Sequence, residues 1–355
     1  MMIKFTYRFL IIKKLKWLIY IYNDKCYTLI RKKKIGAKMI KQINNNKILI
    51  ISHQADIDGM GSVILGKFYF KKFDYLLADN NYDFDLETDI DADVYDTIYI
   101  CDLGFTDKNL QYCLNHQEIA NKIKHFDHHE SEEAKNKYSF VNEVIKLDNH
   151  LTSATELFYT YLLTLPNSEF LRSDFFAKLV ESIRREDTWT FEEVNNTLGP
   201  NLATLHAYLG PIPFIDLLSS LDCSGDFYLP KVYEDIIMHQ NEIKECDVAN
   251  YVNKARLVEF KNYKIAVSIS EGFRYYVGDE LMKKYPMADF ALIINFYRLT
   301  CSLRINNDNY DLGQVAQEFT PNGGGHKRAA GFQFDKDSIP KIEEIISKYL
   351  VLAKK

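Results

Sequence analysis

The sequence predicts an α/β protein with a mostly parallel sheet in its N-terminal part and a second, smaller α/β domain in its C-terminal part. Three observations predict this fold. The chain has 355 residues, more than one hydrophobic core usually holds. From residue 47 onward, short apolar runs alternate with longer stretches of helical period, as in strands connected by helices. The composition, 47% hydrophobic and 26% charged, is that of an ordinary globular protein that can bury a sizeable core.

The first 38 residues differ from the rest of the chain. They carry eleven Lys or Arg against one acid, Asp24, and alternate apolar with basic stretches. Lys13, Lys14 and Lys16 interrupt the apolar stretch and no small-residue cleavage site follows, so we expect neither an integral membrane segment nor a secretory signal. Three interpretations stay open: a translated upstream region with initiation at Met39, which we favour, a basic amphipathic helix on a membrane surface, or an additional packed element.

The charge and the cysteines limit the class of partner and the compartment. Because the whole chain has a net charge of −5, the part after the basic segment is strongly acidic. Non-specific binding of long duplex DNA depends on many Lys and Arg contacts to phosphates, so we do not expect it here, whereas an acidic body suits bound metal cations. No CxxC pair occurs, which predicts neither a zinc knuckle nor a disulfide framework and favours the reducing cytoplasm.

Three apolar runs in the first domain each predict a buried strand, and each is followed directly by His or Asp. KILIIS at 47–52 precedes HQADIDG, DTIYI at 96–100 precedes CDLG, and KIKHF at 122–126 precedes DHHE. In open α/β sheets, ligands bind beyond the carboxyl ends of the strands. The polar residues of these three motifs are therefore expected to meet in one crevice.

The first strand end supplies three candidate metal ligands, His53, Asp56 and Asp58, followed by Gly59 and an apparent helix. The carboxylates of Asp56 and Asp58, two residues apart on a tight turn, are expected to point in different directions. One can therefore serve one metal ion and its neighbour a second ion. Gly59 is expected to relieve the backbone where the helix starts.

The later motifs complete this candidate site. Asp102 is the candidate for a carboxylate shared by both ions, and His128 and Asp187 can complete the second ion. Carboxylates mixed with imidazoles suit a hard to borderline divalent cation, so we expect two divalent ions, preferably manganese, with magnesium or cobalt as alternatives. Taken singly, an Asp after a strand is usually a turn residue or a helix cap, and Asp187 ends an amphipathic helix where it would be merely solvated.

Four motifs in this order, HQADIDG, CDLG, DHHE and RREDTW, resemble those of the DHH phosphoesterase superfamily. Near the C-terminus, CSLRIN, DLGQVAQEF and GGGHKRAAGF resemble the DHHA1 substrate-binding domain of the RecJ, nano-RNase and cyclic-dinucleotide branches. The resemblance implies a catalytic DHH domain over 39–190, a connector over 191–260 and a DHHA1 domain over 261–355, with the active site in the cleft between the two domains. Manganese pyrophosphatases lack the DHHA1 module, so pyrophosphatase activity is not expected.

The resemblance also implies roles for the candidate residues. One metal ion would be held by His53, Asp56 and Asp102, and the other by Asp58, Asp102, His128 and Asp187. Water or hydroxide shared by both cations would attack phosphorus. His129 would face the scissile phosphate, and Asp127 would orient a histidine.

The C-terminal motif predicts a phosphate-binding cradle. Gly323, Gly324 and Gly325 would let backbone amides approach an anion, with His326 at the end of this run. By resemblance, Arg304 would offer its planar fork to a terminal phosphate. We interpret Arg274 and Arg298 as surface charges.

Three hypotheses for the function follow. The first is a nano-RNase-like hydrolase of short oligoribonucleotides that also takes adenosine bisphosphate. The second is a phosphodiesterase for cyclic dinucleotides or other signalling nucleotides, and the third is a nucleotide-binding regulator without catalysis. We favour the first, because no sensory or cyclase-like domain accompanies the motifs and all candidate ligands are present. The partner would be short RNA or a small nucleotide, and the sequence leaves open whether the chain forms a homodimer.

Overall fold

The computed structural model describes four stretches of the chain, residues 39–44, 46–79, 84–129 and 138–352. The basic extension at 1–38 lies outside these residues. The chain divides into two compact units, Met1–Glu234 and Asp235–Lys355, each described by itself below. Within the four described stretches, no helix is both long and apolar enough to cross a bilayer.

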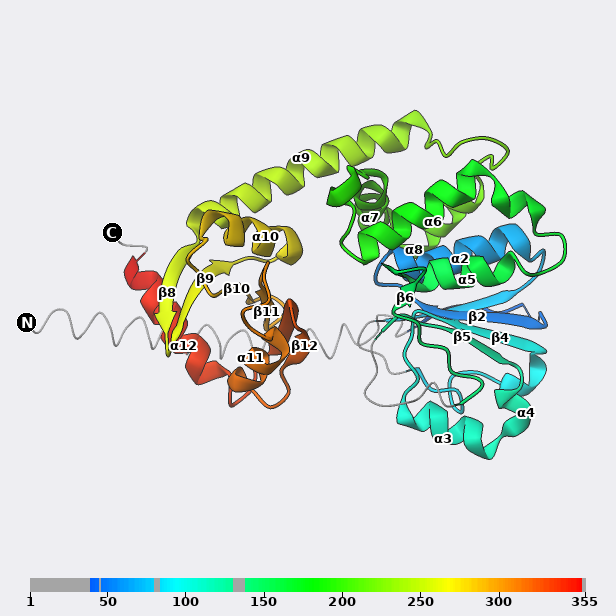
Figure 1. Ribbon diagram of the computed structural model, residues 1–355, viewed down its shortest axis with the longest axis horizontal. Coiled ribbons are helices and arrows are strands. Elements are labelled where there is room, and N and C mark those ends of the chain that lie inside the picture. The colour runs from blue at the N-terminus through cyan, green and yellow to red at the C-terminus, as the bar shows by residue number, and fades with distance from the viewer. Residues whose placement is uncertain (1–38, 45, 80–83, 130–137, 353–355) are drawn as a thin grey trace, which may run out of the picture. The chain divides into compact units, whose positions relative to one another are not determined.

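The first unit contains a five-stranded sheet with the strand order β1-β3-β2-β4-β5 (Figure 1). Its strands are β1 (Met39–Gln42), β2 (Ile48–His53), β3 (Asp74–Ala78), β4 (Thr97–Cys101) and β5 (Ile123–Phe126). Strands β2 to β5 run parallel, and β1 pairs antiparallel with β3 at one edge. The three predicted apolar runs are β2, β4 and β5, which are neighbours in the sheet, so their carboxyl ends meet at one edge.

Helices cover both faces of this sheet (Figure 1). One face carries α2 (Ile57–Tyr69), α5 (Ala154–Leu162) and α6 (Asp174–Asp187), and the other carries α3 (Asp107–Asn115) and α4 (Gln117–Ala120). On the α3 side, Leu49, Ile51 and Ile98 of the strands form one buried cluster with Cys113 and Ile119 of these helices. Apolar side chains on both faces of the central strands explain why those strands read as continuous hydrophobic runs.

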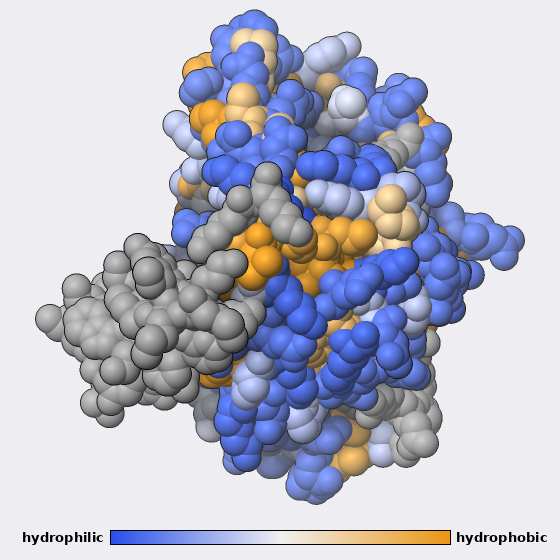
Figure 2. All heavy atoms as spheres, turned by 90° about the vertical axis from the view of Figure 1, so that its left-hand side faces the viewer, coloured by the Kyte–Doolittle hydropathy of each residue, from blue (hydrophilic) through white to orange (hydrophobic). Residues whose placement is uncertain are grey.

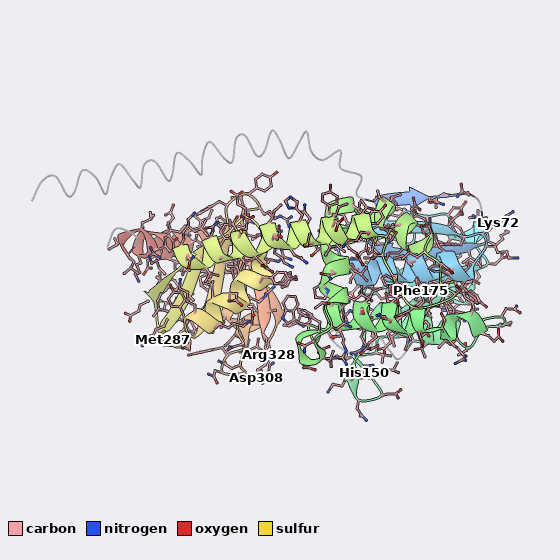
Figure 3. All side chains as sticks on the ribbon, turned by 90° about the horizontal axis from the view of Figure 1, so that it is seen from above. Lys72, His150, Phe175, Met287, Asp308 and Arg328 are labelled. Carbon is pink, nitrogen blue, oxygen red and sulfur yellow. The ribbon has the colours of Figure 1, made fainter. Side chains whose placement is uncertain are left out.

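The remaining elements of the first unit lie around this core. They are the hairpin β6 (Lys146–Leu147) and β7 (His150–Leu151), the helices α7 (Leu198–Leu209) and α8 (Pro211–Ser219), and the short 3₁₀ helices η1 (Ala92–Val94), η3 (Glu169–Arg172) and η4 (Glu192–Val194). His150 of the hairpin is labelled in Figure 3. Long helix α9 (Lys231–Lys254) contains the boundary between the two units.

The second unit is a mixed sheet with helices, in the strand order β12-β13-β11-β10-β9-β8 (Figure 1). The strands are β8 (Arg256–Phe260), β9 (Tyr263–Ile269), β10 (Phe290–Asn295), β11 (Thr300–Arg304), β12 (Gly324–His326) and β13 (Ala329–Gln333). Strands β9 and β10 are parallel, and the other neighbours are antiparallel. The helices are α10 (Arg274–Lys284), α11 (Leu312–Phe319) and α12 (Ile339–Leu352).

The structure confirms the predicted fold class, with a parallel-rich α/β unit followed by a smaller α/β unit. Residues 191–260, expected to be a connector, contain α7 and α8 of the first unit and β8 of the second. Figure 2 shows a face that is mainly hydrophilic, with apolar side chains gathered in a smaller area, as on ordinary globular domains.

Candidate metal centre

The turn from β2 into α2 positions the first two candidate ligands. Asp56 is the N-cap of α2, and its Oδ1 accepts hydrogen bonds from the backbone N–H groups of Asp58 and Gly59. Its Oδ2 lies 3.7 Å from Nε2 of His53. Gly59 is needed for a close approach, because a β-carbon there would lie 2.3 Å from the carbonyl oxygen of His53. One oxygen of Asp56 is therefore committed to the helix and the other faces His53.

Asp102 lies at the centre of the cluster, directly after β4. Its backbone has the left-handed φ of 56°, which is uncommon outside glycine and is tolerated best by Asp and Asn. Its side chain is 2% exposed, and neither carboxylate oxygen has a hydrogen-bond partner. Nε2 of His53 is 2.5 Å from Oδ2, and Nε2 of His128 is 3.4 Å from Oδ1. The two oxygens of Asp102 thus face two different histidines.

Asp58 has a structural partner that the sequence did not reveal. Its two oxygens accept hydrogen bonds from the backbone N–H groups of Ala154 (2.7 Å) and Thr155 (2.9 Å) in the first turn of α5. Thr155 Oγ1 also donates to the backbone carbonyl of Asp58 at 2.7 Å. Ser153 caps this helix, because its Oγ accepts a hydrogen bond from the Glu156 N–H. Asp58 therefore ties α2 to the start of α5 and fixes its own carboxylate.

His128 follows β5, and Asp187 is the last residue of α6. Nε2 of His128 lies 3.3 Å from Oδ2 of Asp187 and 3.8 Å from Oδ2 of Asp58. Buried atoms without a hydrogen-bond partner include Nε2 of His128 and Oδ2 of Asp187. The end of α6 thus reaches the same place as the strand ends.

The six residues expected as ligands fall into two groups that could each hold a cation. In each group, one ligand atom from every member lies within 4.8 Å of the others; the groups are His53 with Asp56 and Asp102, and Asp58 with His128 and Asp187. A third such group joins Asp102 to His128 and His129. Asp102 lies against both histidines, so one carboxylate is within reach of both groups.

The electrostatics of the cluster favour positive charge. Burial raises the pKa of Asp58 to about 6, with the negative charge of Asp102 acting in the same direction. Burial opposes protonation of His53 and His128, yet the surrounding carboxylates raise the pKa of each to about 10. For Asp102, burial acts to raise the pKa, but the positive charge of His53 and the close imidazole rings of His53 and His128 bring it well below its usual value.

These features fit a pair of divalent cations. A buried carboxylate or imidazole without a hydrogen-bond partner costs free energy unless a ligand satisfies it. Here such atoms, from Asp102, His128 and Asp187, all face one small space. Manganese, magnesium and cobalt bind carboxylate oxygens and imidazole nitrogens, which are the donors of this cluster, in preference to thiolates.

His129 and Asp127 lie beside this cluster. Oδ1 of Asp127 accepts hydrogen bonds from Nδ1 of His129 at 2.7 Å and from the backbone N–H of His128 at 2.9 Å. Asp127 is fully buried, whereas the His129 side chain is half exposed. The ring of buried His125 forms hydrogen bonds with the backbone carbonyl of Leu103 and the backbone N–H of Asn142. Asp127 therefore orients the exposed His129 at the edge of the cluster.

His206 of α7 adjoins the site and was missed in the sequence. It is buried against the ring of Phe214 at 5.3 Å and lies beside the backbone of Gln54, the residue after His53. Burial lowers the pKa of His206 to about 4, and the charge of His53 acts in the same direction. A lone histidine in a helix carries no sequence signal of such a contact.

The residues of the expected cradle lie in the second unit, where packing accounts for two of the three glycines. A β-carbon at Gly323 would lie 2.3 Å from the carbonyl oxygen of Ala316, and one at Gly325 would lie 2.6 Å from Cα of Ala330. Gly324 has no atom within 4 Å of that position. His326 ends the edge strand β12 and is exposed. Only Gly324 of the triplet is thus free of a packing requirement.

Two arginines of the second unit differ in their surroundings. Arg328 donates two hydrogen bonds of 2.9 Å to the carboxylate of Asp308, and both side chains are labelled in Figure 3. Arg304 is at the end of β11 and is half-buried, with its Nη1 donating to the Leu303 carbonyl at 2.8 Å. Arg304 therefore keeps donors for a ligand, whereas Arg328 is paired.

A comparison with protein families identifies the first unit. Residues 47–182 match the model of the DHH family, N-terminal domain. This part of the chain is therefore a DHH-family N-terminal domain. The matched region contains β2, β4 and β5 and five of the six candidate ligands, all except Asp187.

Known proteins similar to this chain include a curated oligoribonuclease. The chain is 25% identical over 295 residues to oligoribonuclease NrnB of Bacillus subtilis (strain 168), and the match covers 79% of this chain and 71% of the relative. Two solved structures share the fold. A DHH domain from a member of a family of ribosomal proteins is 16% identical, with a TM-score of 0.58 and coverage of 88% of this chain and 87% of that one. Exonuclease RecJ bound to manganese is 14% identical, with a TM-score of 0.54 and coverage of 87% and 90%.

Proposed function

We propose that this DHH phosphoesterase uses two divalent cations, preferably manganese, to hydrolyse short oligoribonucleotides. The observation that carries the proposal is the position of Asp102, whose two buried oxygens lack hydrogen bonds and face His53 and His128. A carboxylate in that position is suited to be shared by two ions. The similarity to an oligoribonuclease supports RNA as the substrate, and the RecJ structure with manganese supports the choice of metal.

Two sets of residues that share Asp102 would hold the two ions. His53, Asp56 and Asp102 would hold one ion, and Asp58, Asp102, His128 and Asp187 would hold the other. Such a pair supplies an activated nucleophilic water and neutralises the charge that develops on the phosphoryl group. The hydrogen bonds of Asp58 to the first turn of α5 fix its carboxylate before an ion binds, which reduces the cost of ordering the site.

His129 and Asp127 would act on the substrate side of the centre. His129 is the exposed member of the DHH motif and is oriented by the 2.7 Å hydrogen bond to Asp127. We infer that His129 contacts the scissile phosphate, where an imidazole N–H can donate to a non-bridging oxygen. Asp127 is then a positioning residue.

The second unit would bind the distal part of the substrate, as a DHHA1 domain does. Arg304 keeps free N–H donors, His326 is exposed, and the backbone at Gly324 is open. These groups suit an anion such as a phosphate.

A substrate panel tests the proposed function. Purified chain with manganese would be incubated separately with a diadenylate, cyclic di-AMP, adenosine bisphosphate and pyrophosphate, and initial rates compared. We expect the diadenylate to be hydrolysed fastest and pyrophosphate not at all. Turnover of the cyclic substrate alone would instead establish a cyclic-dinucleotide phosphodiesterase, and turnover of none with metal loaded would contradict a catalytic role.

A further inference from the structure

Arg304 of the second unit is held against a tyrosine that no motif pointed to. The Cζ atom of Arg304 lies 4.4 Å from the ring centroid of Tyr275. Arg274 reaches the same residue, with its Cζ 4.9 Å from the ring centroid and its Nη2 donating to the tyrosine hydroxyl at 3.2 Å. Tyr275 itself is 43% exposed. The guanidinium groups of Arg274 and Arg304 therefore both lie against the partly exposed ring of Tyr275.

The surroundings of Arg304 provide a path for its side chain to reach that ring. In the sheet, its register partners on both neighbouring strands are small, Ala291 on β10 and Ala329 on β13. On the helix side, a β-carbon at Gly278 of α10 would lie 2.5 Å from Cγ of Arg304 and 2.8 Å from its Cβ. Glycine inside a helix is unfavourable relative to alanine, so its presence there needs a packing reason. Helix α10 thus carries glycine at the position where the stem of Arg304 passes.

The two positive charges have no carboxylate partner in the described part of the chain. Among the residues that the structure describes, no carboxylate forms an ion pair with Arg274 or Arg304, in contrast to the bidentate pair of Arg328 with Asp308. Burial lowers the pKa of Arg304, and the charge of Arg274 acts in the same direction. Like charges held close together without a carboxylate favour the binding of an anion.

We propose that Tyr275 is a positioning residue that fixes the guanidinium of Arg304, and that Arg274 is a second cation for the same anionic group of the substrate. This inference rests on the proposed function, in which that group is a substrate phosphate. Stacking on an aromatic face restrains a guanidinium while its N–H donors at the edge stay available for a phosphate. Arg274 is then a binding residue, contrary to the expectation of a mere surface charge.

Equilibrium binding to the full chain tests the role of Tyr275. Affinity for 5′-phosphorylated diadenylate would be measured by isothermal titration calorimetry with chelator present, so that no hydrolysis occurs. Tyr275→Phe keeps the ring and should bind within about twofold of the wild type, whereas Tyr275→Leu should bind roughly 2- to 30-fold more weakly, the range for a cation–π contact. Tyr297→Leu, at a 56% exposed tyrosine of the same unit, is the matched control and should leave affinity unchanged.

A double-variant comparison separates positioning from a general structural effect. Arg304→Ala should weaken binding about 10- to 100-fold, as expected for the loss of charge-assisted hydrogen bonds. Adding Tyr275→Leu to Arg304→Ala should cause a much smaller loss than Tyr275→Leu causes in the wild type, because the ring then holds Arg274 but no longer Arg304. Additive losses would overturn the positioning role.

Two further variants keep the proposal open to refutation if Tyr275→Leu does not fold. Gly278→Ala improves helix propensity but displaces Arg304, so it should weaken binding although α10 stays folded. Arg274→Ala should weaken binding more than the matched Arg298→Ala, whose side chain is exposed at the turn after β10. Unchanged affinity in Gly278→Ala or Arg274→Ala would overturn the corresponding part of the proposal.

The outcome is distinguishable from failure of the proposed function. If the chain hydrolyses diadenylate with manganese but Tyr275→Leu and the wild type bind it equally, the inference fails and the proposed function stands. If binding depends on Tyr275 and Arg304 but no diadenylate is hydrolysed, the proposed function fails and the inference stands. Absence of diadenylate binding by the wild-type chain would overturn the inference.

Discussion

The glycine triplet before His326 gives a sharp prediction, because its members have different surroundings. The same chemical change, glycine to alanine, is expected to destabilise the second unit at Gly325 and to be tolerated at Gly324. Gly325 has a φ of +136°, a conformation that L-residues rarely adopt, and its added β-carbon would meet the backbone of Ala330 at 2.6 Å. Gly324 has open space at that position.

The expected loss at Gly325 has two parts. A residue with a β-carbon forced into a sparsely populated backbone conformation costs about 1–3 kcal/mol. Overpacking against backbone that cannot move aside costs a further 1–3 kcal/mol, roughly. Gly325→Ala should therefore lower the free energy of unfolding by about 2–6 kcal/mol, while Gly324→Ala should change it by less than about 0.5 kcal/mol, as at an ordinary surface position.

Urea denaturation followed by two signals measures this difference. Far-UV circular dichroism reports both units, whereas the fluorescence of Trp189, measured with Trp17 replaced by Phe in every variant, reports only the first unit. We expect Gly325→Ala to shift a circular dichroism transition to lower urea without moving the fluorescence transition. Equal stability of the two variants, or a greater loss in Gly324→Ala, would refute the assignment of Gly325 to packing.

Three further predictions concern residues around the two sites. Asp127→Asn should lower kcat about 10- to 100-fold while two metal ions stay bound, because His129 loses its orienting carboxylate. Loss of metal from this variant, measured by elemental analysis, would make Asp127 a ligand instead. His206→Ala should weaken metal binding about 10-fold in calorimetric titrations, since the His53 turn loses its contact at Gln54, and unchanged affinity would contradict that role. Arg328→Ala should leave diadenylate affinity within about twofold, because the exposed pair with Asp308 contributes little; a large loss would place Arg328 in the binding site.

The fold could be predicted because its signals are local. The apolar runs that became β2, β4 and β5 are bounded by polar motifs, and burial on both faces makes them continuously hydrophobic. The edge strand β1 and the antiparallel order of the second sheet depend on contacts between distant segments. Such pairings leave no periodic pattern in the sequence, so the order β12-β13-β11-β10-β9-β8 had to come from the structure.

The candidate site could be predicted in part for the same reason. His53, Asp56, Asp102 and His128 lie at or within three residues of the ends of β2, β4 and β5, and the parallel pairing of these strands brings those ends together. By contrast, the hydrogen bonds from α5 to Asp58 span 96 and 97 residues of sequence. Contacts of that kind, like those of His206 and Tyr275, arise from tertiary packing and are visible only in three dimensions.

The central claim is that Asp102 is shared by two divalent cations. The most direct test is the number of manganese ions bound per chain, measured by elemental analysis after equilibrium dialysis, for the wild type and for Asp102→Asn. The account predicts two ions in the wild type and loss of the pair in the variant, with the fold retained by circular dichroism. One ion in the wild type, or two in Asp102→Asn, would contradict it.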